Sequence, residues 1–373
     1  MGTEVYMDLK DSDMLSTLPG VGDAEVTEAE RVAAQTIGHG MFGSLDQHRG
    51  FPETGPEDEP SIPAAAGAYR IFEYTIPKKQ QPYMAGDDAF TQQRLDALYE
   101  RDCTGQLEGG GHSMVVAAGA STTGGGVENL NPLYPGEQVA LLVVGGGFVS
   151  GDTPPAKWLY VRMARELGRR VFVPRYHVAP KHVYPRPLHD VYTALQHLEA
   201  RGFRPCDVAV VAISAGAHVA LGVLQLRALR GLPPVATCVA VAPCLDLAAG
   251  SDSWRRNQPV CVLPHVPPAS PASLARMYLG PLVDPDALSG GLLRRPLLAP
   301  LHAPQAALPP LQIHAGEHDV LYDDAAALAA RAGTELIAYA GCNHYTILRG
   351  RTQLDRLYGH MRRFVNKKVT CSR

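Results

Sequence analysis

From residue 138 onward, short uninterrupted apolar segments alternate with longer segments in which apolar residues recur at helical spacing. A continuous apolar run such as "VALLVVGG" is typical of a strand that is buried on both faces. Strands that alternate with helices in this way predict a mostly parallel, doubly wound α/β sheet covered by helices on both faces. The predicted strands are 139–146, 170–176, 207–214, 235–247, 310–316 and 335–341, and the predicted helices are 156–168, 185–202, 217–229, 322–333 and 351–367.

Two regions do not follow this alternation. Residues 1–65 end in "RGFPETGPEDEPSIP", which is rich in proline, glutamate and glycine, and they predict an N-terminal extension that contributes to a cap. Residues 251–300 are proline-rich and only partly helical, which is typical of an insertion that lies over a site. The main domain is therefore predicted to span 66–373, with a cap insertion at about 251–300. It opens with a strand in "YRIFEYTI", and the glycine triplets 109–111 and 124–126 are expected to be loops.

Composition narrows the class of protein. The chain has 373 residues, of which 46% are hydrophobic, and a formal net charge of -3, so no basic excess points to nucleic acid or to an anionic membrane. The 7 cysteines show no CxxC spacing, which argues against a zinc site or a disulfide framework and favours a reducing compartment. The N-terminus lacks a signal pattern, and no apolar run approaches the length of a membrane span. We expect a cytoplasmic protein without a membrane segment.

A corner of small residues lies where the strand 207–214 meets the next helix, in "VAISAGAHVAL". One interpretation is packing, because small residues are needed where a strand turns tightly onto a helix. The other is a nucleophile elbow, in which the turn lifts Ser214 Oγ clear of the sheet and the helix N-terminus offers N–H groups to a developing anion. The elbow pattern G-x-S-x-G is met as "AISAG", with Ala212 in place of the first glycine.

Three glycines, Gly145, Gly146 and Gly147, directly follow the buried strand 139–146 in "VVGGGFVSGD". Such a run lets the backbone turn its N–H groups into a cavity, where they could stabilise the oxyanion of a tetrahedral intermediate. The alternative is a phosphate-binding loop. The segment lacks the lysine of a P-loop and the spacing of a dinucleotide fingerprint, so the first interpretation is favoured.

A nucleophilic serine needs a base, and the base needs an orienting acid. Asp319 follows one predicted strand and His344 follows the next, so both lie at the strand ends where ligands collect in such sheets. The chain order Ser, Asp, His is the order of a doubly wound hydrolase sheet. Competing acids nearby are Glu317, Asp323 and Asp324, the last two at the start of a helix.

Residues 138 to about 350 resemble the hormone-sensitive-lipase-like (fold-3) branch of the α/β-hydrolases. The resemblance is carried, in chain order, by "GGGFVSGD", "RYHVAPKHVYPRPLHDVYTALQHL", "APCLDLAAGSDSWRRN", "LARMYLGPLVDPDALSGGLLRRPLLAPL" and "LPPLQIHAGEHDVLYDDAAALAARA". It implies an α/β-hydrolase fold with a helical cap. It also implies Ser214 as nucleophile, Asp319 as acid and His344 as base, with the Ala215 N–H joining Gly145, Gly146 and Gly147 in the oxyanion hole.

The chain departs from the family pattern at three positions. Val144 stands where the family has a histidine before the glycine triplet, so the loop lacks a side-chain hydrogen-bonding anchor. We expect the N-terminal region to replace that anchor. Ala212 and Ile213 stand where the family elbow has glycine and aspartate. The strings "SAGAH" and "GEHD" also resemble arylformamidases, a related group that cleaves an N-formyl amide.

The expected function is a serine esterase or deacetylase that cleaves a small or medium-sized carboxylic ester through an acyl-enzyme, without cofactor or metal. The alternatives are an arylformamidase-like amide hydrolase, a repurposed cyclase or lyase, and a ligand-binding receptor such as the gibberellin receptors, relatives that lost the triad histidine. A homodimer is compatible with the sequence. Four residues are candidates for substrate binding, although each also suits a packed core: Phe148, Tyr176, His218 and Trp254.

Overall fold

An eight-stranded sheet runs through the centre of the protein in the order β1-β2-β4-β3-β5-β6-β7-β8. This architecture is seen in a computed structural model that describes residues 69–75, 112–118, 138–150, 157–179, 182–229, 231–261, 263, 275, 278–280, 293, 297–303, 305, 308–348 and 351–367. Residues 1–65 lie outside the described part, and residues 251–300 are described only in part. The predicted domain boundaries therefore stay a prediction.

The strands from β3 onward are parallel to one another, while β2 is antiparallel to both of its neighbours. Each strand that the apolar runs predict is present, and the predicted parallel α/β sheet is confirmed. The strands are β1 (Tyr69–Thr75), β2 (His112–Ala118), β3 (Val139–Val143), β4 (Arg170–Pro174), β5 (Val208–Ile213), β6 (Thr237–Val241), β7 (Leu311–Gly316) and β8 (Leu336–Tyr339).

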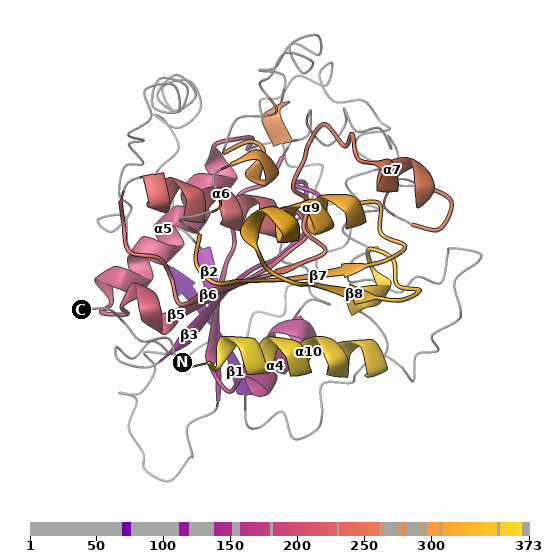
Figure 1. The fold of residues 1–373 in the computed structure, drawn as a ribbon. Helices are drawn as coiled ribbons and strands as arrows, with labels where there is room; N and C mark the ends of the chain where they lie inside the picture. The colour runs from indigo at the N-terminus through magenta and orange to yellow at the C-terminus, as the bar shows by residue number, and fades with distance from the viewer. Residues whose placement is uncertain are drawn as a thin grey trace, which may run out of the picture.

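Helices cover both faces of the sheet, as Figure 1 shows. One face carries α4 (Lys157–Leu167) and α10 (Arg351–Val365), which pack on each other, and the opposite face carries α5 (Arg186–Ala200), α6 (Ala215–Leu229) and α9 (Tyr322–Ala332). A short helix, α7 (Asp252–Arg256), follows β6 within the predicted cap region and packs on α9. Three 3₁₀ turns complete the described elements: η6 (Pro205–Asp207), η11 (Pro300–His302) and η12 (Thr346–Leu348).

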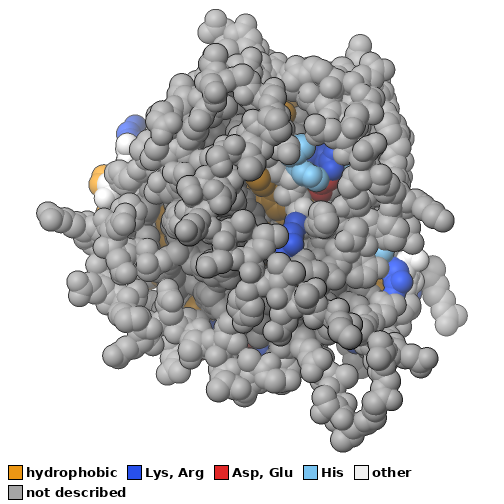
Figure 2. All heavy atoms as spheres, turned by 180° about the vertical axis from the view of Figure 1, so that it is seen from behind, with side chains coloured by type: hydrophobic (Ala, Val, Ile, Leu, Met, Phe, Trp, Pro, Cys, Tyr) orange, Lys and Arg blue, Asp and Glu red, His pale blue; other side chains and the backbone are white. Residues whose placement is uncertain are grey.

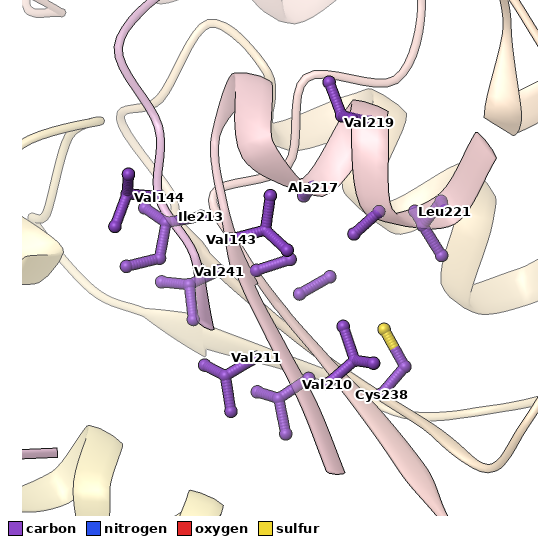
Figure 3. Close-up of a cluster of buried hydrophobic side chains, with 14 of the residues drawn as sticks. Val143, Val144, Val210, Val211, Ile213, Ala217, Val219, Leu221, Cys238 and Val241 are labelled. Atoms are coloured by element: carbon purple, nitrogen blue, oxygen red, sulfur yellow. The ribbon is translucent and has the colours of Figure 1, made fainter. Parts of the chain in front are cut away.

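The core extends over both faces of the sheet, and one part of it lies between α6 and the central strands. Every residue of β3, β5 and β6 is buried, as expected for strands that are covered on both faces. Valine side chains of β3, β5 and β6 lie beneath Ala217, Val219 and Leu221 of α6 (Figure 3). This packing fixes the start of α6, and with it Ser214, relative to the carboxyl ends of the parallel strands.

Two features differ from the sequence analysis. The strand β2 is not among the predicted strands, because its short run "HSMVVAA" lies between glycine-rich stretches and becomes a strand by pairing with β1 and β4. Cys206 is disulfide-bonded, so the expectation of reduced cysteines is wrong at that position. The other described cysteines are free and buried: Cys238, Cys244, Cys261 and Cys342.

Within the described ranges, no helix has both the length and the apolar composition that a membrane crossing requires. Near the middle of the face shown in Figure 2, histidine, basic and acidic side chains lie beside hydrophobic ones.

The helix α6 approaches the end of β3 closely at Gly216. A Cβ at this position would lie 2.3 Å from the backbone oxygens of both Val143 and Val144. These are backbone atoms of a buried strand end, so they cannot move aside cheaply. The glycine two residues after Ser214 is therefore a packing requirement as well as part of the elbow pattern.

We expect Gly216→Ala to lower the free energy of unfolding by about 1–3 kcal/mol, the usual cost of overpacking a core. Gly359→Ala is the matched control, because the same added methyl in α10 would meet only the end of the Arg363 side chain, at 3.6 Å. That change should raise stability by up to about 1 kcal/mol through helix propensity. Thermal unfolding of both variants checks the pair, and equal effects would contradict the packing argument.

Candidate active site

Ser214 lies at the turn between β5 and α6 with a backbone φ of +53°, in the left-handed region that residues other than glycine rarely adopt. The turn is held by several backbone hydrogen bonds. Ser214 N–H donates to the Val241 carbonyl over 2.9 Å, and the Ser214 carbonyl accepts from Ala217 N–H at 2.9 Å and Cys244 N–H at 3.2 Å. Strain of this kind persists only where the surroundings impose it, and it is common at functional sites.

The three side chains of the predicted triad form one hydrogen-bonded row. Ser214 Oγ lies 2.9 Å from His344 Nε2, and His344 Nδ1 lies 2.9 Å from Asp319 Oδ2. Because a carboxylate can only accept, Nδ1 carries a proton toward Asp319 and Nε2 is left to accept from the serine hydroxyl. All three residues are at most 4% exposed. This geometry suits transfer of the serine proton to the imidazole.

The loop that carries Asp319 is held by a residue that the sequence analysis misses. Asn257 follows α7, and its side-chain amide donates to the backbone carbonyls of Glu317 at 2.9 Å and Asp319 at 2.7 Å. The Asp319 carboxylate also accepts from Leu321 N–H at 3.0 Å and contacts Cys261 Sγ at 3.9 Å. No local sequence pattern marks Asn257, because its partners lie about sixty residues away.

The loop that carries His344 is tied to the same segment. Asn343 donates through its side chain to the Val260 carbonyl at 3.2 Å, and its side-chain oxygen accepts from the backbone N–H groups of Tyr345 and Thr346, both at 3.1 Å. The residues from Asn257 to Cys261 therefore connect the acid loop with the base loop.

The competing acids have other partners or surroundings. Glu317 is exposed. Asp323 accepts from Ser253 N–H at 2.8 Å and from Arg256 at 2.7 Å, which joins the start of α9 to α7. Asp324 is buried, and its burial raises its pKa to about 7. The nearby carboxylates act in the same direction, and a hydrogen bond from Ser251 acts in the opposite direction. Among the described acids, Asp319 is the one that is hydrogen-bonded to His344.

The glycine triplet leaves β3 in a strained loop. Gly146 has a φ of +135°, Gly147 of +59° and Phe148 of +68°, and a Cβ at Gly146 would lie 2.0 Å from the Ser150 carbonyl oxygen. The Gly146 carbonyl accepts from Val149 N–H at 3.1 Å and Ser150 N–H at 2.9 Å, which closes the turn. The conformation explains why glycine is needed at these positions, and the oxyanion role of the triplet stays a prediction.

Two contacts from the segment after β4 hold this loop. The Tyr176 hydroxyl donates to the Val144 carbonyl at 2.7 Å, and Ala179 N–H donates to the Phe148 carbonyl at 2.8 Å. We expected the N-terminal region to supply the missing anchor. That region lies outside the described residues, and the anchors that the structure describes come from this segment instead. Burial raises the pKa of Tyr176, so its hydroxyl keeps the proton that it donates.

The segment around Tyr176 is itself bound to Asp190 of α5. Backbone N–H and Nδ1 of His177 both lie 2.8 Å from Asp190 Oδ2, and Arg186 Nε donates to Oδ1 at 2.9 Å. Burial alone would raise the pKa of Asp190, but hydrogen bonds from His177 and His189 and the charges of His177 and Arg186 outweigh it and hold the pKa well below its usual range. Asp190 thus stays charged and supports the glycine loop through the segment that carries Tyr176.

The predicted substrate-binding residues do not all lie together. Phe148 contacts His218, with ring centroids 5.3 Å apart, and both contact Tyr278, at 4.4 and 5.0 Å. Tyr278 is a member of this cluster that the sequence analysis misses. Tyr176 uses its hydroxyl on the loop backbone. Trp254 lies half-buried in α7 against the core, and no described ring contact joins it to the cluster.

Known proteins resemble this chain over the segment that contains the row of Ser214, His344 and Asp319. The family model described as alpha/beta hydrolase fold (Abhydrolase_3) matches residues 141–348. An acetyl-hydrolase of Streptomyces hygroscopicus is 30% identical over 225 residues, which cover 59% of this chain and 70% of the relative. A protein of Mycobacterium tuberculosis named carboxylesterase/phospholipase LipF is 28% identical over 223 residues, covering 59% of this chain and 56% of that relative.

Solved structures agree with the sequence relatives. The crystal structure of an esterase from the bacterial hormone-sensitive lipase (HSL) family matches with a TM-score of 0.56 and 25% identity. The match covers 69% of this chain and 82% of that chain. The chain spans just over half of LipF and somewhat more than two thirds of the acetyl-hydrolase.

We expect Tyr176→Phe to lower kcat on an ester substrate by about tenfold with a smaller effect on KM, because it removes the hydroxyl that holds the loop beneath a developing charge. The comparison is deletion of residues 1–65, the other expected anchor. If the deletion lowers kcat and Tyr176→Phe does not, the loop is held from the N-terminal region.

Asp324→Asn should change how stability depends on pH. Burial raises the pKa of the Asp324 carboxyl to about 7 in the folded protein, above its ordinary value of 3.8. Between those two pKa values the folded state binds more protons than the unfolded state, so the free energy of unfolding falls as pH rises. Above about pH 7 the buried carboxyl is ionised and its full destabilising effect is present. The difference in melting temperature between the variant and the wild type should therefore be more favourable to the variant at pH 8 than at pH 4. An equal difference at both pH values would contradict the shifted pKa.

Proposed function

The chain belongs to the hormone-sensitive-lipase-like branch of the α/β-hydrolase family, and we propose that it cleaves a small or medium-sized carboxylic ester through a Ser214, His344 and Asp319 triad. The proposal is supported by the names of its relatives, which are an acetyl-hydrolase and a carboxylesterase/phospholipase. The observation that carries the finer proposal is the unbroken hydrogen-bonded row from Ser214 Oγ through His344 to Asp319.

In the acylation step, Ser214 Oγ attacks the carbonyl carbon of the ester while its proton passes to His344 Nε2. Asp319 holds the Nδ1 proton of His344 and stabilises the imidazolium that forms. The tetrahedral intermediate collapses as His344 returns the proton to the leaving alcohol, and an acyl-Ser214 enzyme remains. Water, activated by His344, then releases the carboxylic acid and restores the serine. These steps use only protein groups, so the proposal includes no metal and no cofactor.

The oxyanion hole of this proposal consists of backbone N–H groups of Gly145, Gly146 and Gly147 and that of Ala215. Ala215 is the first residue of α6, and the N–H groups of a first helical turn have no partner within the helix. The positive end of the helix dipole favours negative charge at the same place. Each such donor typically contributes about 3–4 kcal/mol to lowering the barrier, so the hydrogen bonds that hold the glycine loop bear directly on the rate.

The triad is tested by single substitutions and hydrolysis of p-nitrophenyl acetate. Ser214→Ala and Asp319→Asn should each lower kcat by about 10⁴-fold or more, the second because the imidazole would adopt the wrong tautomer. Asp323→Asn is the matched control, since Asp323 is paired with Arg256 rather than with His344. Melting curves should show that all variants fold. Wild-type turnover by Ser214→Ala, or a greater loss in Asp323→Asn than in Asp319→Asn, would overturn the assignment.

The class of bond is tested with p-nitrophenyl esters of increasing acyl length beside an N-formyl aryl amide. We expect the highest kcat/KM for a short or medium acyl chain, with free acid and p-nitrophenol as the products. Faster cleavage of the formyl amide than of every ester would replace the esterase proposal by an amide hydrolase. A product that has not gained water would replace it by a lyase or cyclase.

A further inference from the structure

Two buried polar side chains beside the glycine loop make no hydrogen bond of normal geometry with another described residue. They are His218, at both ring nitrogens, and Tyr278, at its hydroxyl, and each residue is 0% exposed. Burying a polar group without a partner costs free energy, so such groups are rare and often serve a function. The proposed mechanism uses neither of them.

Their position connects them to the reacting groups. His218 lies one helical turn beyond Ser214 on α6, and its backbone N–H donates to the Ser214 carbonyl at 3.4 Å. Its ring meets the edge of Phe148, the residue that directly follows the glycine triplet, and Tyr278 packs on the same phenyl ring at 4.4 Å. The two polar side chains are thus next to each other, with ring centroids 5.0 Å apart, and both pack against the residue that follows the glycine triplet.

Tyr278 is held in this place by a second aromatic residue. Tyr184 N–H donates to the Tyr278 carbonyl at 2.7 Å, and the two rings pack edge to face at 5.6 Å. The backbone of Tyr278 is therefore fixed while its hydroxyl stays unsatisfied. A side chain that served only to fill the core could be phenylalanine here.

Both groups are neutral at physiological pH. Burial lowers the pKa of His218 to about 3, although a weak backbone hydrogen-bonding contact with Cys244 acts in the opposite direction. Burial raises the pKa of Tyr278 well above its usual value, helped by Tyr184, Tyr176 and Cys244. A neutral imidazole supplies one donor and one acceptor, and a phenol supplies a donor. Together they suit a neutral polar group, since a buried charged group would remain uncompensated.

We propose that His218 and Tyr278 form a polar subsite that binds a neutral hydrogen-bonding group, such as a hydroxyl or an amide, close to the scissile ester of the substrate. This inference rests on the proposed esterase function and narrows its substrate class. The preferred substrate is then an ester with a polar substituent rather than a simple aliphatic ester. A site that is built to bind such a group discriminates strongly against the analogue that lacks it.

The test compares matched ester pairs that differ by one hydroxyl. One pair is p-nitrophenyl butyrate and p-nitrophenyl 3-hydroxybutyrate, and the other places the hydroxyl on the alcohol, as in propyl and 3-hydroxypropyl butyrate. Wild-type enzyme should prefer the hydroxylated member in at least one pair. Tyr278→Phe and His218→Leu should each lower that preference, the ratio of the two kcat/KM values, by about tenfold.

Tyr358→Phe is the matched control. Tyr358 lies in α10, and its hydroxyl is likewise buried with no partner among the described residues. Removing either unsatisfied hydroxyl should raise the melting temperature, but only Tyr278→Phe should change the preference. An unchanged preference in both subsite variants, or a lower melting temperature in Tyr278→Phe, would overturn the subsite. Wild-type enzyme that hydrolyses no ester would overturn the proposed function as well, so the two failures are distinguishable.

Discussion

The close approach of α6 to the end of β3 is the constraint on which the site depends. It requires glycine at position 216, because a methyl group there would lie 2.3 Å from two backbone oxygens of the strand end. Ser214, two residues earlier, takes a left-handed conformation at the start of the same helix, where backbone hydrogen bonds hold the turn. Serine, helix dipole and loop are therefore positioned by one packing contact in the most deeply buried part of the sheet (Figure 3).

The remaining groups are positioned by hydrogen bonds between loops. Asn257 and Asn343 join the acid loop and the base loop through the segment that follows α7. Tyr176 and Ala179 hold the glycine loop, and Asp190 holds the segment that carries Tyr176. The hydrogen bonds Tyr176–Val144 and Asn257–Asp319 are buried, in a medium of low dielectric where a hydrogen bond is stronger than in water and costly to leave unmade, and the others are partly buried. The valine at position 144 is thus compatible with a firmly held loop.

Much of this arrangement could be predicted from the sequence, for physical reasons. Strands β3 to β8 follow from apolar runs, because strands that are buried on both faces cannot tolerate polar residues. Ser214, Asp319 and His344 follow from their places at strand ends and from the family resemblance. The strand β2 was missed because its assignment depends on pairing with β1 and β4 rather than on its own short segment.

The supporting residues were missed for a related reason. Asn257 contacts carbonyls some sixty residues away, and Tyr278 meets Phe148 and His218 only in the folded chain. Nothing in the local pattern around either residue distinguishes it from an ordinary polar or aromatic position. The disulfide of Cys206 also escapes prediction, because its spacing from the other cysteines matches no simple motif.

The most direct test of the central claim, that Ser214 is an activated nucleophile, is covalent labelling with a fluorophosphonate probe followed by mass spectrometry of the peptides. A serine hydroxyl reacts rapidly with such a probe only when an adjacent base accepts its proton and the oxyanion is stabilised. The account predicts one label per chain, located on Ser214, and loss of the label in His344→Ala protein that is still folded. Failure of folded wild-type protein to react, or attachment of the label to a different serine, would contradict it.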